Sequence, residues 1–342
     1  MEPSLTLHAE TLGGAPAPPG TSQEVAPAAL AGATGWLNSP PLTAEALRGR
    51  VVLVQFWTFT CINWLRTLPY VRAWAQRYAN QGLVVVGVHT PEFDVERDVE
   101  HVRRAAQELG VAYPVALDSD YAVWEAFSNR FWPALYLIDA EGRIRHHRFG
   151  EGDEARTERV LQRLLTEAGA DGVGTDPTPV DPRGVEVAAD WDSIRSGETY
   201  LGYGRTENFV SFDDTVPDGA HVYAVPDRLR LNSWGLAGNW TIHRQAAVLN
   251  AGGGRIAVRF HARDLHLVAG PVEGGSPVGF RVTLDGRPPG PAAGVDVDAD
   301  GNGTLSEPRL HQLVRQPGRV AERTFQITFL DPGVRAYALT FG

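Results

Sequence analysis

The only cysteine of the chain lies where an apolar run gives way to an amphipathic one, and this turn constrains the fold more than any other feature. The run Val51-Val52-Leu53-Val54 is short and β-branched, which is typical of a buried parallel strand. The residues that follow Cys61 have helical spacing. Cys61 is therefore expected at the N-cap or first turn of a helix, where free backbone N–H groups and the helix dipole favour a thiolate.

The segment Phe56 to Trp64, with Cys61 inside it, resembles the active-site turn of the thioredoxin-like superfamily. In that family a Cys-x-x-Cys motif opens the helix, a proline kinks it about two turns later, and a cis-proline faces the first sulfur. Pro69 and Pro133 stand at the two matching positions. The segment also resembles the motif Phe-Trp-Thr-x-x-Cys-Ile-Asn-Cys of DipZ-type cytochrome c biogenesis proteins, a TlpA/redoxin-type group. The resemblance implies a thioredoxin-like fold and thiol-disulfide chemistry that needs no cofactor.

The chain departs from this motif at its second cysteine, which is Trp64. A dithiol enzyme resolves its mixed disulfide with the second thiol, and this chain has none. Gln55 stands where many thioredoxins carry a buried acid. Two roles stay open for Trp64: the indole stacks on a substrate or shields the sulfur, or it fills the space of the resolving thiol.

Several residues are expected to surround the sulfur. Arg66 lies one turn into the helix, and His89 and Glu92 follow the next parallel strand, whose C-terminal end reaches the same edge of the sheet. A hydrogen-bonded loop histidine is an equally good interpretation of His89. The predicted site is Cys61 with the neighbours Thr58, Asn63, Trp64, Arg66, His89, Glu92, Trp132 and Pro133.

Composition excludes several classes of function. The 342 residues carry a net charge of −10, which argues against a nucleic-acid partner. All 31 cationic residues are arginine, so lysine Schiff-base and phosphate-loop mechanisms are excluded. The first residues show no signal-peptide pattern and no run reaches transmembrane length, which predicts a cytoplasmic chain, or an extracytoplasmic one if the sequence is a trimmed form of a longer protein.

Four segments differ in texture. Residues 1–30 are rich in Ala, Pro and Gly and are expected to form a flexible leader. Residues 31–169 alternate apolar runs with helical patterns, which indicates an α/β domain, with strands expected at 83–88, 135–138 and 144–149 and helices at 96–109, 121–127 and 155–168. Residues 170–190, rich in Gly and Pro, are predicted to be a linker.

Residues 191–342 are predicted to form an all-β sandwich. Apolar residues alternate with polar ones in the triplets Ile256/Val258/Phe260, Phe280/Val282/Leu284 and Phe325/Ile327/Phe329. The DipZ-type resemblance extends through this region and implies a jelly roll similar to carbohydrate-binding modules. A glycan is therefore a candidate partner of this domain.

The segment 296–307 satisfies the calcium-loop pattern Asp-x-Asp-x-Asp-Gly-x5-Glu. Pro308 follows at once and no helices flank the loop, so an EF-hand is not expected. A Ca²⁺-binding β-loop and an acidic hairpin neutralised by Arg309 or Arg315 stay as alternatives. The candidate ligands are Asp296, Asp298, Asp300, Asn302 and Glu307.

The sequence therefore predicts a thioredoxin-like α/β domain followed by a β-sandwich, with Cys61 as the single redox sulfur. The expected partner is a protein or small-molecule disulfide or thiol, and an external thiol completes the cycle. Two alternatives are a degenerate thioredoxin fold that serves as a binding scaffold, and a one-cysteine peroxidase. The peroxidase interpretation rests on Thr58, three residues before Cys61, but Val54 stands where the peroxidase motif has proline.

Overall fold

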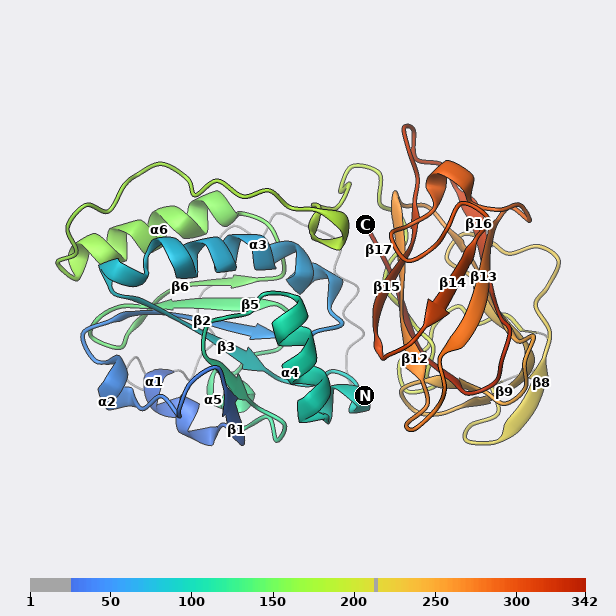
Figure 1. The fold of residues 1–342 in the computed structure, drawn as a ribbon, viewed down its shortest axis with the longest axis horizontal. Helices are drawn as coiled ribbons and strands as arrows, with labels where there is room; N and C mark the ends of the chain where they lie inside the picture. Colours follow the sequence, from blue (N-terminus) through green and yellow to red (C-terminus); the bar gives the residue numbers. More distant parts are fainter. Residues whose placement is uncertain (1–25, 212–214) are drawn as a thin grey trace. The chain divides into compact units, whose positions relative to one another are not determined.

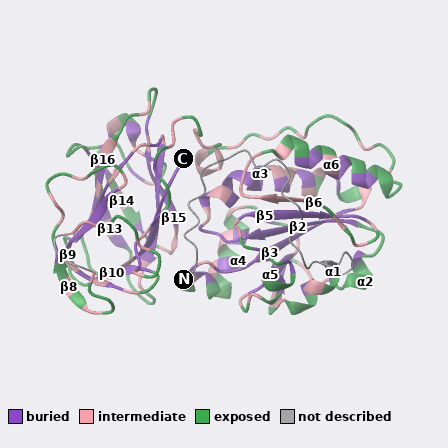
Figure 2. Cartoon of the chain, turned by 180° about the vertical axis from the view of Figure 1, so that it is seen from behind, coloured by how far each residue is buried: buried purple, intermediate pink, exposed green. Residues whose placement is uncertain are grey.

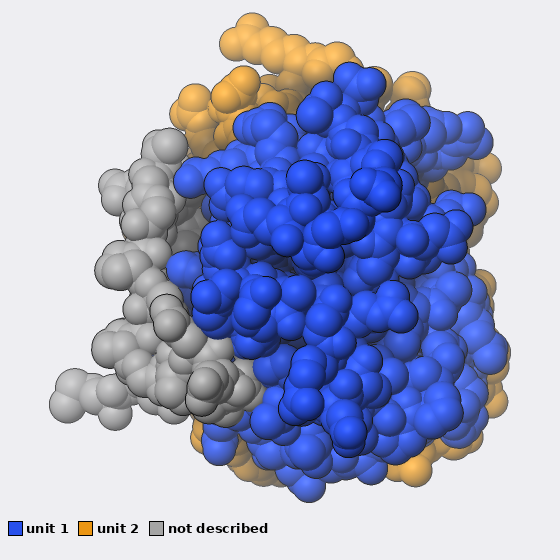
Figure 3. Space-filling model, turned by 90° about the vertical axis from the view of Figure 1, so that its left-hand side faces the viewer, with its two compact units in different colours: residues 1–186 blue, residues 187–342 orange. Residues whose placement is uncertain are grey.

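A computed structural model describes residues 26–211 and 215–342. The chain divides into two compact units, Met1–Glu186 and Val187–Gly342, which are coloured separately in Figure 3. Most of the predicted leader, residues 1–25, lies outside the described residues.

The first unit is built on a mixed sheet whose strands run in the order β1-β4-β3-β2-β5-β6 (Figure 1). Strands β2, β3 and β4 are parallel, and β5 runs antiparallel to β2. Every residue of the central strand β2 is buried, because helices cover both faces of the sheet. The strands are β1 (Gly35–Leu37), β2 (Val51–Trp57), β3 (Leu83–His89), β4 (Val115–Leu117), β5 (Ala134–Ile138) and β6 (Ile144–Phe149).

Helices α3 and α6 lie on one face of this sheet, and α1, α2 and α5 lie on the other (Figure 1). On the second face Val54 and Phe56 of β2 pack with Val123 and Phe127. The helical segments are α1 (Ala26–Ala29), η1 (Leu30–Gly32), α2 (Ala44–Leu47), α3 (Ile62–Arg77), η2 (Ala79–Gln81), η3 (Asp94–Arg97), α4 (Val99–Glu108), α5 (Ala122–Ala126), α6 (Glu154–Glu167) and η4 (Gly184–Glu186).

The predicted helix at 96–109 is two elements in the structure. The 3₁₀ turn η3 covers Asp94–Arg97, and α4 begins only at Val99. The Asp98 side chain accepts a hydrogen bond from the N–H of Glu100 and so caps α4 at its N-terminus. Glu96 therefore lies before the N-cap of α4, and its side chain accepts hydrogen bonds from backbone N–H groups of the preceding turn.

Part of the predicted linker packs against the first unit. Arg72 of α3 pairs with Glu186 at 2.6 Å, and Arg77 donates to the backbone oxygen of Asp176 and to the hydroxyl of Thr178. Buried Glu158 of α6 accepts from the N–H of Thr178 at 3.0 Å. A glycine- and proline-rich composition does not reveal such anchors, because single polar side chains supply them.

The second unit is an antiparallel β-structure in which β9 pairs with β10 on one side and with β11 on the other. The alternating triplets predicted from the sequence face inward and are fully or almost fully buried (Figure 2). Its elements are β7 (Thr199–Tyr200), β8 (Ala220–Tyr223), β9 (Trp234–Ile242), β10 (Ala247–Leu249), β11 (Arg255–Phe260), β12 (Asp264–Pro271), β13 (Val278–Leu284), η5 (Gly290–Ala292), β14 (Asn302–Leu305), β15 (Arg309–Arg315), β16 (Arg323–Phe329) and β17 (Val334–Phe341).

The core of this unit joins aromatic and aliphatic side chains from the facing strands, among them Trp234, Trp240 and Phe260. The register sets Val258 of β11 opposite Phe325 of β16, and Val282 of β13 opposite Ile327. Cross-strand pairs of this kind stabilise a sheet locally. Within residues 26–211 and 215–342, the helices lack the length and apolar character that crossing a bilayer requires.

Candidate functional site

Cys61 is held at a strand-to-helix turn. Strand β2 ends at Trp57, and Cys61 is the N-cap of α3 with φ −76° and ψ 111°. Its N–H donates to the carbonyl oxygen of Thr58 at 3.2 Å, and its carbonyl oxygen accepts from the N–H of Leu65 at 3.0 Å. The backbone on both sides of the sulfur is thus fixed, by the turn before it and by the first helical hydrogen bond after it.

The sulfur itself is half-buried and faces the segment before β5. The Cys61 thiol donates to the carbonyl oxygen of Trp132, with Sγ 3.6 Å from that oxygen. The Trp132–Pro133 peptide bond is cis. The Trp132 indole is held in turn, because its Nε1 donates to the Thr90 carbonyl oxygen at 2.9 Å and its ring centroid lies 4.2 Å from that of Trp124. A carbonyl acceptor stabilises the protonated thiol and so acts against the helix dipole.

Trp64 points into the interior. Its side chain is fully buried and stacks on Trp57, with ring centroids 4.3 Å apart and planes 24° apart. Its Nε1 donates to Oε1 of Gln55 at 3.2 Å, while Nε2 of Gln55 donates to the Thr67 hydroxyl at 3.0 Å. Of the two roles left open by the sequence, this geometry matches the filling of interior space. Gln55, at the position of the buried acid, serves as hydrogen-bond partner to the indole.

Arg66 of α3 forms a buried ion pair with Glu151. Its Nη1 lies 3.0 Å from Oε1 of Glu151, and the two side chains are only 2% and 7% exposed. Burial raises the pKa of Glu151, and the Arg66 guanidinium opposes that shift. The pair joins α3 to the loop after β6. The ion pair with Glu151 accounts for the burial of Arg66, and its predicted role beside the sulfur stays a prediction.

His89 and Glu92 lie at the end of β3, as their spacing predicts. The buried His89 ring has its centroid 4.8 Å from that of Trp57 and 5.9 Å from that of Phe59. Burial lowers the pKa of His89 to about 3, so the imidazole is neutral at physiological pH. Glu92 is half-buried. The remaining predicted neighbours are Thr58, which is fully buried, and Asn63, which is half-buried in the first turn of α3.

Glu96 is a site residue that sequence reasoning missed. Its carboxylate is buried, and Oε1 accepts a 2.5 Å hydrogen bond from the hydroxyl of Thr60, the residue before Cys61. Oε2 accepts from the N–H groups of Glu92 at 2.6 Å and Phe93 at 2.8 Å. Burial raises the pKa of Glu96 to about 7, the Glu92 carboxylate adds to the shift, and the hydrogen bonds oppose it. In the sequence Glu96 is the first residue of the predicted helix at 96–109, and an acid at a helix start does not by itself reveal burial.

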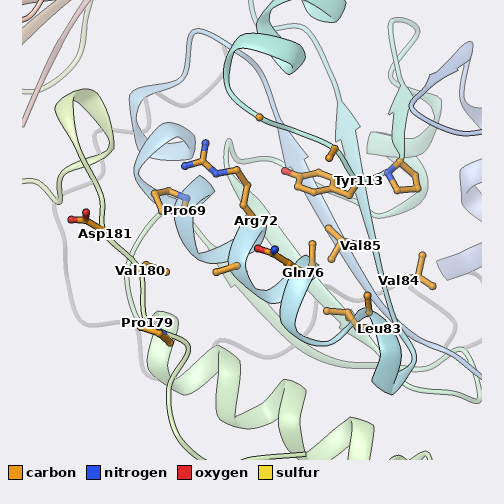
Figure 4. A pocket seen from close by; sticks show the side chains of 16 residues that line it. Pro69, Arg72, Gln76, Leu83, Val84, Val85, Tyr113, Pro179, Val180 and Asp181 are labelled. Atoms are coloured by element: carbon orange, nitrogen blue, oxygen red, sulfur yellow. The ribbon is translucent and has the colours of Figure 1, made fainter.

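A cavity of the first unit lies beside α3, and Cys61 is not among its lining residues. Figure 4 shows Pro69, Arg72 and Gln76 of α3 on one wall and Pro179 to Asp181 across from them. Tyr113 contributes a buried hydroxyl that has no hydrogen-bond partner among the described residues. The volume is about 790 Å³.

The acidic loop of the second unit is held by protein contacts. Asp296 pairs with Arg309 at 2.6 Å and accepts from the N–H of Gln312 at 2.8 Å. Asp298 accepts from the N–H of Asn302 at 2.7 Å. Across the described part of the chain, no group of three or more His, Cys, Asp or Glu side chains is arranged to hold a metal. Of the two arginines predicted to neutralise the loop, Arg309 does so.

Arg315 pairs instead with buried Asp264, at 2.7 Å. Gly301 has φ +92°, and a Cβ there would come within 2.2 Å of the Val282 carbonyl oxygen. The glycine of the calcium-loop pattern is thus required by the packing of the turn against β13.

The sheet order, the N-cap cysteine and the cis Trp132–Pro133 peptide bond define a thioredoxin-like domain, and comparison with known proteins agrees. Residues 17–165 match the family described as Redoxin, and residues 196–342 match the one described as Thioredoxin like C-terminal domain. The Bacillus subtilis thiol-disulfide oxidoreductase YkuV is 30% identical over 138 residues, which cover 40% of this chain and 93% of YkuV. The chain belongs to the thioredoxin-like thiol-disulfide oxidoreductase family, which confirms the fold expected from the sequence.

Protein DipZ of Mycobacterium tuberculosis is 36% identical over 316 residues, which cover 92% of this chain and 42% of DipZ. The chain thus spans less than half the length of that relative. A solved structure of a thioredoxin-like protein in the oxidised form is 32% identical and aligns with 39% of this chain and 90% of its own, with a TM-score of 0.37.

Proposed function

We propose that this protein is a thiol-disulfide oxidoreductase that uses Cys61 as its single redox sulfur and depends on an external thiol to complete each cycle. The observation that carries the proposal is the half-buried Cys61 at the N-cap of α3, with a fully buried indole at position 64. Family membership supports the chemistry, and the presence of one cysteine in the chain sets the requirement for a second reactant.

The cycle follows thiol-disulfide exchange. The Cys61 thiolate attacks one sulfur of a substrate disulfide, which forms a mixed disulfide and releases the other sulfur as a thiolate that takes up a proton. An external thiolate then attacks the Cys61 sulfur and releases the second substrate thiol. A second external thiol releases Cys61, so that two external thiols are oxidised to one disulfide while one substrate disulfide is reduced.

Insulin reduction with glutathione as the only reductant tests this cycle. We expect turnover that rises with glutathione concentration and is lost in Cys61→Ser, whereas Ser276→Ala, at an exposed loop of the second unit, serves as the matched control. Without an added monothiol, the reduced protein should stop at a mixed disulfide between Cys61 and the substrate, and release of both substrate thiols in that experiment would contradict the single-sulfur mechanism. Reduction that is equal in the wild type and in Cys61→Ser would contradict the proposed activity itself.

A binding scaffold is the second candidate function, and the packing of Trp64 favours it. The indole is hydrogen-bonded and stacked in the core, so the turn is completed by protein contacts and has no space for a second thiol. In this alternative Cys61 stays a thiol that donates to Trp132. The rate of Cys61 alkylation at neutral pH separates the two, because a thiolate reacts fast and a carbonyl-bound thiol does not.

For the second unit we keep glycan and Ca²⁺ binding as proposals. The support for a glycan is the resemblance of the domain to carbohydrate-binding jelly rolls. The support for Ca²⁺ is the loop pattern at 296–307, and a cation there must displace Arg309 from Asp296. A glycan array and calcium calorimetry on the full chain test the two separately.

A further inference from the structure

Glu96 joins two turns that meet at the edge of the sheet where Cys61 lies. Thr60, directly before Cys61, belongs to the turn between β2 and α3, whereas Glu96 belongs to η3 after β3. One carboxylate oxygen accepts from Thr60 at 2.5 Å, and the other accepts from two backbone N–H groups at 2.6 and 2.8 Å. The Thr60 and Glu96 side chains are 2% and 1% exposed, respectively. The carboxylate therefore links the turn that carries Cys61 to the turn after β3.

A carboxylate is a costly choice for a purely structural clamp. Burial penalises the charged form, and a neutral amide of the same shape can accept from N–H groups and pair with a hydroxyl without this cost. Burial raises the pKa of Glu96 to about 7, so the group changes its charge within the physiological range. The hydroxyl that donates to Glu96 belongs to Thr60, the residue directly before the only thiol of the chain.

We propose that Glu96 is a positioning residue for Cys61, whose carboxyl group holds the Thr60–Cys61 turn and whose ionisation sets how readily the Cys61 thiolate forms. This inference rests on the proposed function, in which Cys61 is the nucleophile. A negative Glu96 disfavours a second negative charge on the sulfur, whereas a protonated Glu96 keeps the clamp and removes the repulsion. The proton on Glu96 and the reactivity of Cys61 are thereby coupled.

The titratable and charged groups around Glu96 belong to its own segment, to the start of α5 and to the end of β3. Glu92, on the same segment, raises the pKa of Glu96. Tyr121, at the start of α5, has its own pKa raised chiefly by burial, with a contribution from Glu96, and the guanidinium of Arg97 lies over its ring. His89 at the end of β3 is neutral above about pH 4, because burial lowers its pKa to about 3. Glu96 is thus the group expected to titrate near neutral pH.

The test is the rate of Cys61 alkylation by iodoacetamide, which is uncharged, measured from pH 5 to 9 on the full chain. Wild type is compared with Glu96→Gln and with Glu108→Gln, an exposed acid at the end of α4, as matched control. In the plot of alkylation rate against pH, we expect a break near pH 7 for wild type and for Glu108→Gln. For Glu96→Gln we expect a single transition, that of the Cys61 thiol. Loss of one like charge is expected to lower the alkylation midpoint by about one pH unit, about tenfold in thiolate fraction. A thiolate of lower pKa is also less nucleophilic. The alkylation rate of Glu96→Gln below the midpoint should therefore exceed that of wild type by only about three- to fourfold.

A Glu96→Gln profile that parallels wild type would overturn the inference and leave Glu96 as a structural clamp. If Glu96→Gln does not fold, Thr60→Val decides the question, because it keeps the carboxylate but removes a donor to it. The neutral-pH break should then move upward, since the charged form has lost a hydrogen bond, and an unmoved break would contradict the coupling. Failure of the proposed function has a different signature: Cys61 would then react slowly at neutral pH in every variant.

Discussion

Replacement of Trp64 tests whether its indole is a core side chain, and the structure sets the size of the effect. Trp64 is fully buried against Trp57, so Trp64→Ala should destabilise the protein by about 3–5 kcal/mol through lost burial and the cavity that remains. The Gln55 oxygen also loses its indole donor, which adds about 1–3 kcal/mol. Trp64→Phe keeps a ring against Trp57 and loses mainly the donor, so about 1–3 kcal/mol is expected.

Urea unfolding at constant m-value measures these differences. Trp191 is 51% exposed, so Trp191→Ala is the matched control and should stay within about 0.5 kcal/mol of wild type. If Trp64→Ala cost no more than Trp191→Ala, the indole would not be part of the core. The order Ala, then Phe, then wild type in rising stability is expected if packing and the Gln55 hydrogen bond act together.

Trp64→Cys adds a second measurement at the same position. In the reduced state it should cost as much as Trp64→Ala, because the side chains are similarly small. Oxidation should join the new cysteine to Cys61 in a disulfide. Because this disulfide restricts the unfolded chain over residues 61–64, it should stabilise the folded state by about 2 kcal/mol relative to the reduced variant. Thiol titration of the denatured oxidised protein reports the bond directly. Two free thiols after oxidation would mean that this turn lacks the geometry of a dithiol site.

Three further outcomes are expected. Stability should fall as pH rises from about 4.5 to about 7, by about 3 kcal/mol in wild type relative to Glu96→Gln, because the folded state holds the Glu96 proton to higher pH than the unfolded state; parallel pH profiles of urea unfolding would contradict this. Arg66→Met should lower the free energy of unfolding by about 3–5 kcal/mol, because it leaves Glu151 buried and unpaired, and the double variant with Glu151→Met should recover most of this loss. An equal loss in the single and the double variant would contradict the ion pair. The melting temperature of the wild type should be higher with Ca²⁺ than with EDTA, and Asp298→Ala should abolish this difference. Equal melting temperatures of the wild type in the two conditions would leave the loop as an acidic turn.

The order of strands and helices in the first unit could be predicted because their signals are local. The apolar run at 51–54 and the helical spacing after Cys61 each lie within one element, and the structure extends the strand only as far as Trp57. The β-sandwich was equally accessible, since its period-two triplets occupy inward-facing positions on β11, β13 and β16. Alternation of this kind follows from strand geometry and needs no knowledge of partners.

The site was harder to predict, because its contacts join segments that lie far apart in the sequence. The clamp between Thr60 and Glu96 spans 36 residues, and the ion pair between Arg66 and Glu151 spans 85. Sequence spacing placed Arg66 one turn from the sulfur, but a helix position does not say which side chain across the fold it will meet. The cost of burying a charge explains why Arg66 meets Glu151. Arg66 is only 3% exposed, so its guanidinium needs a carboxylate partner, which Glu151 supplies. The same reasoning makes Glu96 informative, since it is a buried acid that accepts hydrogen bonds from the Thr60 hydroxyl and from the N–H groups of Glu92 and Phe93. An acid held in this way keeps its proton near neutral pH, and the only thiol of the chain is one residue from the hydroxyl that holds it.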